Sequence, residues 1–184
     1  MKLACMGDSL TNGHGLRPSQ CWTHLLANKL DIEVDNYGIS GDTTGGMVGR
    51  FNNMLITENP SHVFIMGGTN DLSFGLPDNL ILSNLKTMTR QARHLGMTFI
   101  LGVPTTYYPT GAAKLYEIST NQFVDRLLGL QNRIKQFIDV DTCLSIDFSY
   151  GLDKEHFLED GIHPNEAGQV IMADRAFESL RGIV

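Results

Sequence analysis

The sequence predicts one α/β domain over residues 1–184, with a parallel β-sheet at its centre and helices on both faces. Two observations lead to this class. Short apolar runs alternate with longer segments of helical period, and the runs lack the polar–apolar alternation of a half-exposed strand. Runs of that kind fit strands buried on both faces of a parallel sheet. Strands that alternate with helices form βαβ units, whose crossovers are right-handed.

The expected elements follow from these two patterns. Five apolar runs are the predicted strands, at residues 3–6, 32–36, 62–66, 98–103 and 143–146. Four segments carry apolar residues at helical spacing and are the predicted helices, at residues 22–30, 80–95, 123–137 and 165–181. Gly96 is well placed to end the second of these helices. We find no linker, repeat or low-complexity segment that would divide the chain.

The composition argues against nucleic acid and against the membrane interior as partners. Fourteen Lys and Arg against twenty Asp and Glu give a net charge of −6, so the chain lacks the basic footprint of a nucleic-acid-binding protein. Its longest apolar runs fall far short of the ~20 residues that a membrane helix needs, so we expect no stable membrane insertion. The first apolar run is too short for a secretory signal. We therefore expect a cytoplasmic protein, or an exported one if a leader preceded this sequence.

The three cysteines are odd in number and widely spaced, at Cys5, Cys21 and Cys143. They form neither a disulfide framework nor a metal-binding C-x-x-C pair, and we expect them to be small core residues. The oligomeric state cannot be read from any of these patterns.

Small polar residues and glycines follow the predicted strands. Ser9 comes directly after the first strand, Gly41 lies after the second and Asn70 after the third. Asp160 and His163 lie between the last strand and the last helix. The carboxyl ends of parallel strands meet at one edge of the sheet, where ligands of such folds bind. We therefore expect these five residues to lie close together.

Together these residues have the groups that acyl transfer requires. Ser9 supplies a hydroxyl on a tight turn, and the His163 imidazole can take its proton near neutral pH. Asp160 can hold the second nitrogen of that imidazole. The backbone N–H groups of Ser9 and Gly41 and the side-chain amide of Asn70 can meet an oxyanion.

Each of these motifs, taken alone, also has a simpler structural interpretation. Asp8 and Ser9 could merely cap a helix, and the glycines between residues 38 and 46 could serve turns. Asn70 and Asp71 could form a turn stabilised by side-chain-to-backbone bonds, and His163 could be an ordinary loop histidine. The occurrence of all of them, in order and at successive strand ends, favours the catalytic interpretation.

The sequence resembles the SGNH hydrolases, also called the GDSL esterase/lipase superfamily. Gly7–Leu10 spells the G-D-S-L block, Gly68–Asp71 fits G-x-N-D, and Asp160–His163 fits D-x-x-H, with Gly41 in the remaining block. The resemblance implies a flavodoxin-like three-layer α/β/α sandwich with strand order 2-1-3-4-5. It implies Ser9 as nucleophile, His163 as base and Asp160 as its acid, with Ser9, Gly41 and Asn70 in the oxyanion hole. Within this family, the sequence resembles small bacterial esterases of the thioesterase/lysophospholipase type.

The predicted function is therefore a serine esterase that works through an acyl-enzyme and needs no cofactor. Its expected partner is a small-molecule ester, with a short- to medium-chain acyl group, a thioester or a lysophospholipid as the main class. A carbohydrate O-acetylesterase of the same family is one alternative. A non-catalytic flavodoxin-like module that binds a small anion is another, although it has no need of Ser9, Asp160 and His163 together.

Other patterns are less specific. Apolar residues near the expected site could line a substrate pocket, and the candidates are Leu72, Phe74, Tyr107, Tyr108 and Phe157. His156 and His163 lie seven residues apart with acidic residues nearby, so a metal site is conceivable, although we expect none. The glycines of residues 38–49 never spell G-x-G-x-x-G, and no phosphate loop motif occurs.

Overall fold

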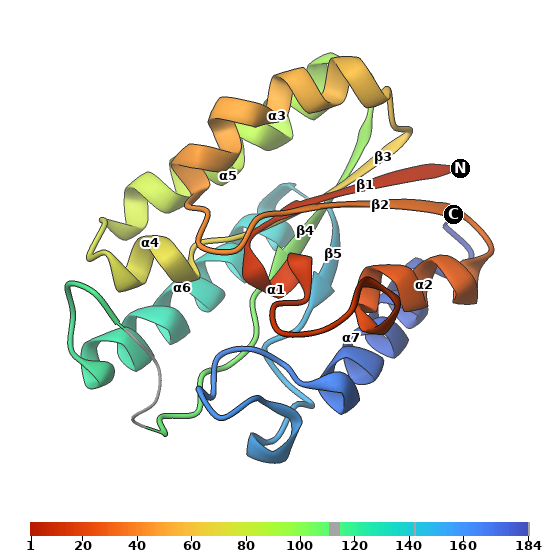
Figure 1. Cartoon of the computed structure of the whole chain (residues 1–184). Coiled ribbons are helices and arrows are strands. Elements are labelled where there is room, and N and C mark those ends of the chain that lie inside the picture. The colour runs from red at the N-terminus through yellow and green to blue at the C-terminus, as the bar shows by residue number, and fades with distance from the viewer. Residues whose placement is uncertain (111–114, 142, 184) are drawn as a thin grey trace.

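Five parallel strands form one sheet in the order β2-β1-β3-β4-β5. The computed structural model describes residues 1–110, 115–141 and 143–183 (Figure 1). The strands are β1 (Lys2–Gly7), β2 (Glu33–Gly38), β3 (His62–Met66), β4 (Thr98–Val103) and β5 (Leu144–Asp147). The sheet confirms the predicted fold class and the strand order that the resemblance implied.

Helices cover both faces of the sheet (Figure 1). One face packs against α3 (Thr44–Glu58), α5 (Asp78–His94) and α6 (Thr120–Asp141), and the other against α2 (Trp22–Leu30) and α7 (Glu166–Leu180). Alternate residues of the central strands enter the two cores, as Ala4 and Met6 face one and Leu3 and Cys5 the other. Burial on both faces explains why β1 reads as a continuous apolar run.

Two short helices begin where strands end. Helix α1 (Ser9–Asn12) follows β1, and helix α4 (Thr69–Ser73) follows β3. Two 3-10 helices, η1 (Pro18–Gln20) and η2 (Lys154–His156), lie in the connections before α2 and before α7. The β1–α1 and β3–α4 turns place the polar residues of the sequence motifs at the carboxyl edge of the sheet.

The structure corrects three details of the predicted elements. Helix α3 was not predicted, because Gly45, Gly46 and Gly49 break its helical pattern and resemble turn residues. Strand β2 was predicted to be buried on both faces, yet none of its residues is fully buried. It is an edge strand paired only with β1, and its outer side has no neighbouring strand. Cys5 and Cys21 are buried as expected, whereas Cys143 is only partly buried.

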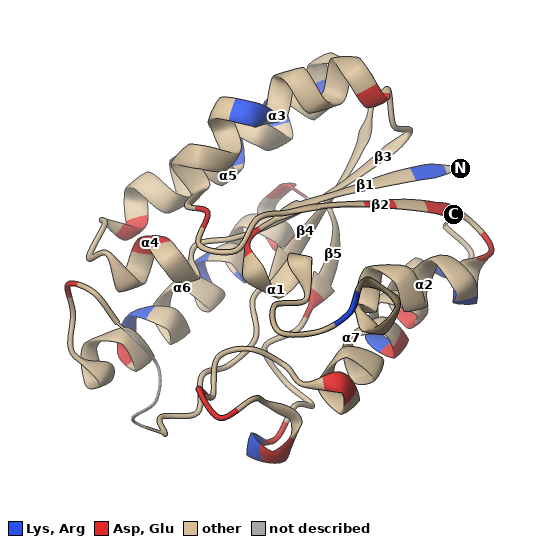
Figure 2. Ribbon diagram, viewed as in Figure 1, with Lys and Arg blue, Asp and Glu red and all other residues tan. Residues whose placement is uncertain are grey.

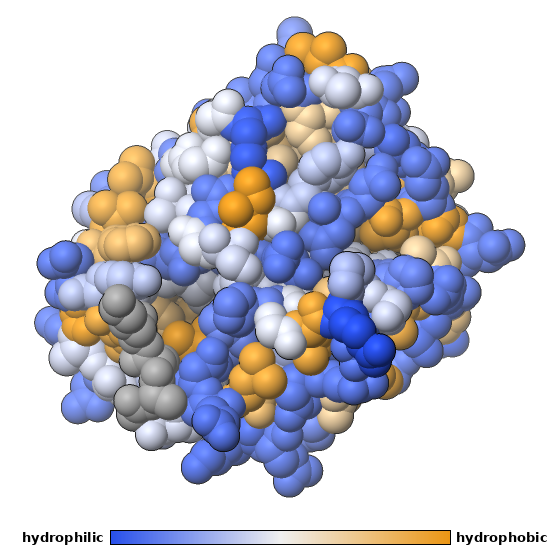
Figure 3. Space-filling model, viewed as in Figure 1, coloured by the Kyte–Doolittle hydropathy of each residue, from blue (hydrophilic) through white to orange (hydrophobic). Residues whose placement is uncertain are grey.

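The surface agrees with the composition. Acidic and basic residues are interspersed along the helices (Figure 2). On the face shown in Figure 3, apolar residues form separate small patches among hydrophilic ones. Within the part of the chain that the structure describes, no helix is long and apolar enough to cross a membrane.

Candidate active site

The nucleophile turn, residues 7–13, joins β1 to the end of α1 and is held from within. Asp8 is fully buried and caps α1, since its Oδ1 accepts the Leu10 N–H at 2.9 Å. Its Oδ2 accepts the Thr69 hydroxyl at 2.7 Å. A Cβ on Gly7 would lie 2.0 Å from Thr11 Oγ1, so only glycine fits there. These contacts fix Ser9, the first residue of α1, at the strand end.

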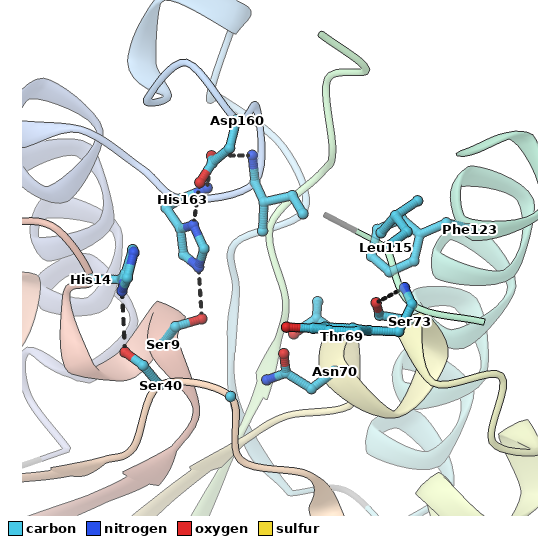
Figure 4. Close-up of a pocket in the computed structure, with 13 residues that line it drawn as sticks. Ser9, His14, Ser40, Thr69, Asn70, Ser73, Leu115, Phe123, Asp160 and His163 are labelled. Atoms are coloured by element: carbon cyan, nitrogen blue, oxygen red, sulfur yellow. Dashed lines mark hydrogen bonds and ion pairs between the residues drawn. The ribbon is translucent and has the colours of Figure 1, made fainter. Parts of the chain in front are cut away.

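The base loop, residues 157–165, reaches Ser9 from the other end of the chain. His163 Nε2 lies 2.8 Å from Ser9 Oγ, and His163 Nδ1 lies 2.6 Å from Asp160 Oδ2 (Figure 4). The other oxygen of Asp160 accepts the N–H groups of Ile162 and His163, at 2.9 and 3.0 Å. The Asp160 carboxylate thus orients both the imidazole ring of His163 and the backbone N–H of that residue.

The electrostatics of this pair suit a proton acceptor. Burial lowers the pKa of His163 below its ordinary value, and the hydrogen bond and charge of Asp160 oppose this only in part. The pKa of Asp160 is also lowered: burial acts to raise it, but the hydrogen bonds from His163 and Ile162 outweigh that effect. Near neutral pH the pair is therefore a carboxylate beside a neutral imidazole, whose Nε2 can accept the Ser9 proton.

Gly41 and Asn70 face the same space as Ser9 (Figure 4). Gly41 has φ +84°, which favours glycine, and the room that a Cβ would occupy is open. Backbone conformation, not crowding, therefore explains the glycine. The Asn70 amide donates to the Asp42 carbonyl at 2.9 Å. Because a side-chain amide carries two N–H donors, this bond leaves the second for a ligand.

Buried charges brace the loops that carry these groups. Asp71 is fully buried, and its two oxygens accept the Thr44 N–H at 2.9 Å and the Thr44 hydroxyl at 2.6 Å. Arg50 donates to the carbonyls of Tyr37 and Gly7, at 2.7 and 3.0 Å, and to the Asp42 carboxylate at 2.8 Å. The ends of β1 and β2, the start of α3 and helix α4 are thereby held in one arrangement.

A cavity of about 320 Å³ lies beside Ser9 and His163. Hydroxyl, imidazole and amide groups surround it near Ser9, and apolar side chains form its other end (Figure 4). Its lining among the described residues consists of Ser9, His14, Ser40, Gly41, Thr69, Asn70, Ser73, Leu115, Tyr116, Phe123, Asp160, Ile162 and His163. The arrangement can hold a carbonyl carbon against Ser9 Oγ with an apolar group alongside.

The five residues predicted to bind substrate lie outside this lining. Leu72 and Tyr107 are buried in the core under α5 and α6, and Phe157 is buried in the core under α7. The Tyr108 hydroxyl donates to the Leu152 carbonyl at 2.7 Å, and Phe74 stacks at the surface on Tyr116. The correction has one cause: nearness to a motif along the chain does not determine which way a side chain points.

Tyr108 and Phe157 instead support the base loop. The Tyr108 N–H donates to the Gly161 carbonyl at 2.9 Å, and the Tyr108 ring packs on Phe157 with ring centres 5.2 Å apart. Gly161 has φ +69°, and a Cβ there would lie 1.9 Å from the Tyr108 carbonyl oxygen. Glycine is therefore required between Asp160 and His163.

His14 and Ser40 line the cavity but were not among the predicted site residues. The sequence signal for His14 is its place between Gly13 and Gly15, shortly after the G-D-S-L block. Both glycines have positive φ, at +79° and +81°. Within the described ranges, no three His, Cys, Asp or Glu side chains gather where they could hold a metal ion.

Comparisons with known proteins agree with this geometry. The GDSL-like Lipase/Acylhydrolase family matches residues 5–171. An arylesterase of Vibrio mimicus is 27% identical and covers 97% of this chain and 88% of its own. The thioesterase 1/protease 1/lysophospholipase L1 of Escherichia coli (strain K12) is 26% identical, covering 99% and 84%. A crystal structure of TesA superposes with a TM-score of 0.82 at 25% identity, covering 100% of both chains. The chain therefore belongs to the GDSL-like lipase/acylhydrolase family, and it is an ester-hydrolysing enzyme.

Proposed function

We propose that Ser9 is the nucleophile, His163 the general base and Asp160 the acid that orients His163. The observation that carries this proposal is the unbroken chain of hydrogen bonds from Asp160 through His163 to Ser9 beside the cavity, with both distances at or below 2.8 Å. A neutral imidazole is the form that can take the Ser9 proton, and the lowered pKa of His163 supports that form near neutral pH.

In the acylation step, Ser9 Oγ attacks the ester carbonyl carbon while its proton passes to His163 Nε2. The carbonyl oxygen becomes negative and is met by the N–H groups of Ser9 and Gly41 and by the free N–H of Asn70. Collapse of this intermediate breaks the bond to the alcohol, which takes the proton from His163. Water then attacks the acyl-enzyme by the same route, releasing the acid and regenerating Ser9.

The proposed substrates are esters with short- to medium-chain acyl groups. The cavity volume of about 320 Å³ lies near the small end of ligand pockets, which range over roughly 300–1,000 Å³. At its apolar end, Leu115 and Phe123 can contact an alkyl chain but offer a sugar ring few hydrogen-bond partners. The names of the Vibrio and E. coli relatives, an arylesterase and a thioesterase/lysophospholipase, support the same substrate class.

Labelling with a fluorophosphonate tests the nucleophile. We expect the intact mass to rise by one adduct, and Ser9→Ala to abolish both the adduct and ester turnover. Ser40→Ala is the matched control for the labelling: Ser40 Oγ also lies 3.3 Å from an imidazole, that of His14, but Ser40 is not the proposed nucleophile, so this variant should still take up one adduct. An adduct that survives Ser9→Ala would overturn the assignment.

A series of chromogenic esters of increasing chain length, set against acetylated sugars, tests the substrate class. We expect kcat/KM to favour short- to medium-chain acyl esters over the sugars. Preference for the acetylated sugars would instead support a carbohydrate O-acetylesterase.

A further inference from the structure

His14 lies beside His163, the proposed catalytic base, although its side chain is not buried there. It lies in the connection between α1 and η1, and its side chain is exposed. Positive φ angles at Gly13 and Gly15 turn the chain so that the ring reaches the site. A Cβ on Gly13 would lie 2.1 Å from Cys21 Sγ, so this turn is built into the surrounding packing.

The His14 ring contacts two parts of the active site at once. Its centre lies 4.4 Å from the centre of the His163 ring, with the planes inclined by 39° (Figure 4). His14 Nδ1 lies 3.3 Å from the hydroxyl of Ser40, the residue before Gly41. Ser40 Oγ in turn lies 3.5 Å from Asn12 Oδ1, and the Asn12 amide donates to the Gly38 carbonyl at 3.0 Å.

The His163 ring needs a support of this kind. Asp160 and Ser9 hold its two nitrogens, but both bonds lie at the ends of the ring and leave it free to tilt about the line that joins them. Such a tilt leaves Nε2 nearly in place but turns its lone pair, which lies in the plane of the ring, away from the Ser9 proton. A second ring packed on one face restricts the tilt, and small misplacements of a reacting group are costly in rate.

We propose that His14 is a positioning residue that packs against the ring of His163 and ties it, through Ser40, to the loop that carries Gly41. This inference rests on the proposed catalytic role of His163. His14 itself moves no proton in the reaction: the ring contact does the positioning, so another flat ring should replace it.

His14 also affects the pKa of His163, which a purely steric support would not do. Among the described residues, the titratable groups that act on the charge of His163 are Asp160 from the base loop and His14 from the connection after α1. Asp160 raises the pKa of His163, and His14 lowers it. Removing the imidazole at position 14 should therefore raise the pKa of His163 and move the acid limb of kcat/KM to higher pH.

Three variants separate these effects. We expect His14→Ala to lower kcat about tenfold with KM changed less than about twofold, because the reacting geometry loosens while the cavity remains. His14→Phe keeps a ring and should retain kcat, yet both variants should show the raised acid limb. His24→Ala is the matched control, since His24 is an exposed histidine on α2 away from the cavity, and its kinetics should equal those of the wild type.

A spectroscopic signal reports the ring directly. The His163 Nδ1 proton, in its 2.6 Å bond to Asp160, should give a downfield NMR resonance that broadens in His14→Ala and sharpens again in His14→Phe. Thermal denaturation should show equal stability for both variants, since the side chain is exposed.

Two results would overturn the inference: wild-type kcat and pH profile in His14→Ala, or a loss in His14→Phe as large as in His14→Ala. Failure of the catalytic proposal looks different. In that case Ser9→Ala and His163→Ala would keep ester turnover, whereas a failure confined to His14 would leave those two variants inactive.

Discussion

The nucleophile turn and the base loop bring opposite ends of the chain to one hydroxyl, but they are held in different ways. Residues 7–11 of the turn are all buried, and the Asp8 carboxylate is enclosed with them. In the base loop the side chains of Asp160 and His163 remain 25% and 18% exposed. The loop keeps its shape mainly through short-range backbone bonds, such as the Leu158 N–H to the His163 carbonyl at 2.8 Å.

The two carboxylates show what this difference means. Burial raises the pKa of Asp8 to about 6, and its two hydrogen bonds offset that only in part. The pKa of Asp160 is lowered instead, because hydrogen bonds to His163 and Ile162 outweigh a smaller loss of solvent. The acid next to Ser9 in sequence therefore braces the fold, and the acid 152 positions later serves the base. Substituting Asp160 should therefore reduce activity, whereas substituting Asp8 should change stability.

His163→Ala should have the largest effect on turnover. Without the base, we expect kcat to fall by about 10⁴–10⁶-fold, the size seen when one member of a serine triad is removed. Stability should change less, because the base loop keeps its shape mainly through backbone bonds that this substitution leaves intact. Steady-state kinetics and thermal denaturation check both statements, and retention of a tenth of the activity would show that the base lies elsewhere.

Asp160→Asn should cost less but change the pH profile. We expect a loss in kcat of about 10³–10⁴-fold, because an amide does not stabilise the imidazolium or hold the correct tautomer. Wild-type kcat/KM should rise with pH through one ionisation below 6.5, since the pKa of His163 is lowered. Asp160 acts to raise that pKa, so its removal should move the inflection still lower.

The matched control for Asp160→Asn is Asp153→Asn. Asp153 is an exposed carboxylate just before the base loop, and its substitution should leave the profile unchanged. An unshifted inflection in Asp160→Asn would argue against the pairing of Asp160 with His163 in solution.

Asn70→Ala tests the proposed oxyanion hole, which belongs to neither the nucleophile turn nor the base loop alone. The oxyanion forms only on the way to the transition state, so the loss should fall on kcat, by about 10²–10³-fold or roughly 2.7–4 kcal/mol. KM should change little. Asn79, on α5 and without a role in the site, gives the control variant Asn79→Ala. A kcat within a few-fold of wild type would leave Ser9 and Gly41 as the oxyanion donors.

Asp8→Asn should have the smallest effect on turnover and a clear effect on stability. Because the folded-state pKa of Asp8 is raised from 3.8 to about 6, the folded state binds the proton more tightly than the unfolded state. The free energy of unfolding of the wild type should therefore fall as pH rises from about 4 to about 6, by on the order of 3 kcal/mol. Asparagine still caps a helix, so activity should largely persist.

Denaturant titrations of wild type and Asp8→Asn between pH 4 and pH 7 measure this difference. We expect the stability of the variant relative to the wild type to increase with pH across that window. Parallel pH dependences would mean that the Asp8 carboxylate is not destabilised by its burial.

Much of the fold was predictable from the sequence, because its signals are local. Strands buried on both faces must be apolar throughout, and helices that cover a sheet must repeat their apolar residues at helical spacing. Two details differ from the prediction: β2 is a strand but lies at an edge and is not buried on both faces, and α3 was missed because it begins with glycines that look like a turn. The candidate catalytic residues were predictable because strand ends of a parallel sheet share one edge.

The sequence itself determined the chemical identity of the site residues and their order along the chain: a serine after β1, a glycine after β2, an asparagine after β3 and an Asp–His pair after β5. Only the tertiary structure decided which way each side chain faces and how much water reaches it. Leu72 and Tyr107 lie near the motifs yet point into the core, while Phe123 on α6 reaches the cavity. His14 meets His163 across 149 positions. Direction and burial depend on contacts between distant segments. Burial raises the pKa of Asp8, whereas hydrogen bonds within the base loop lower the pKa of Asp160.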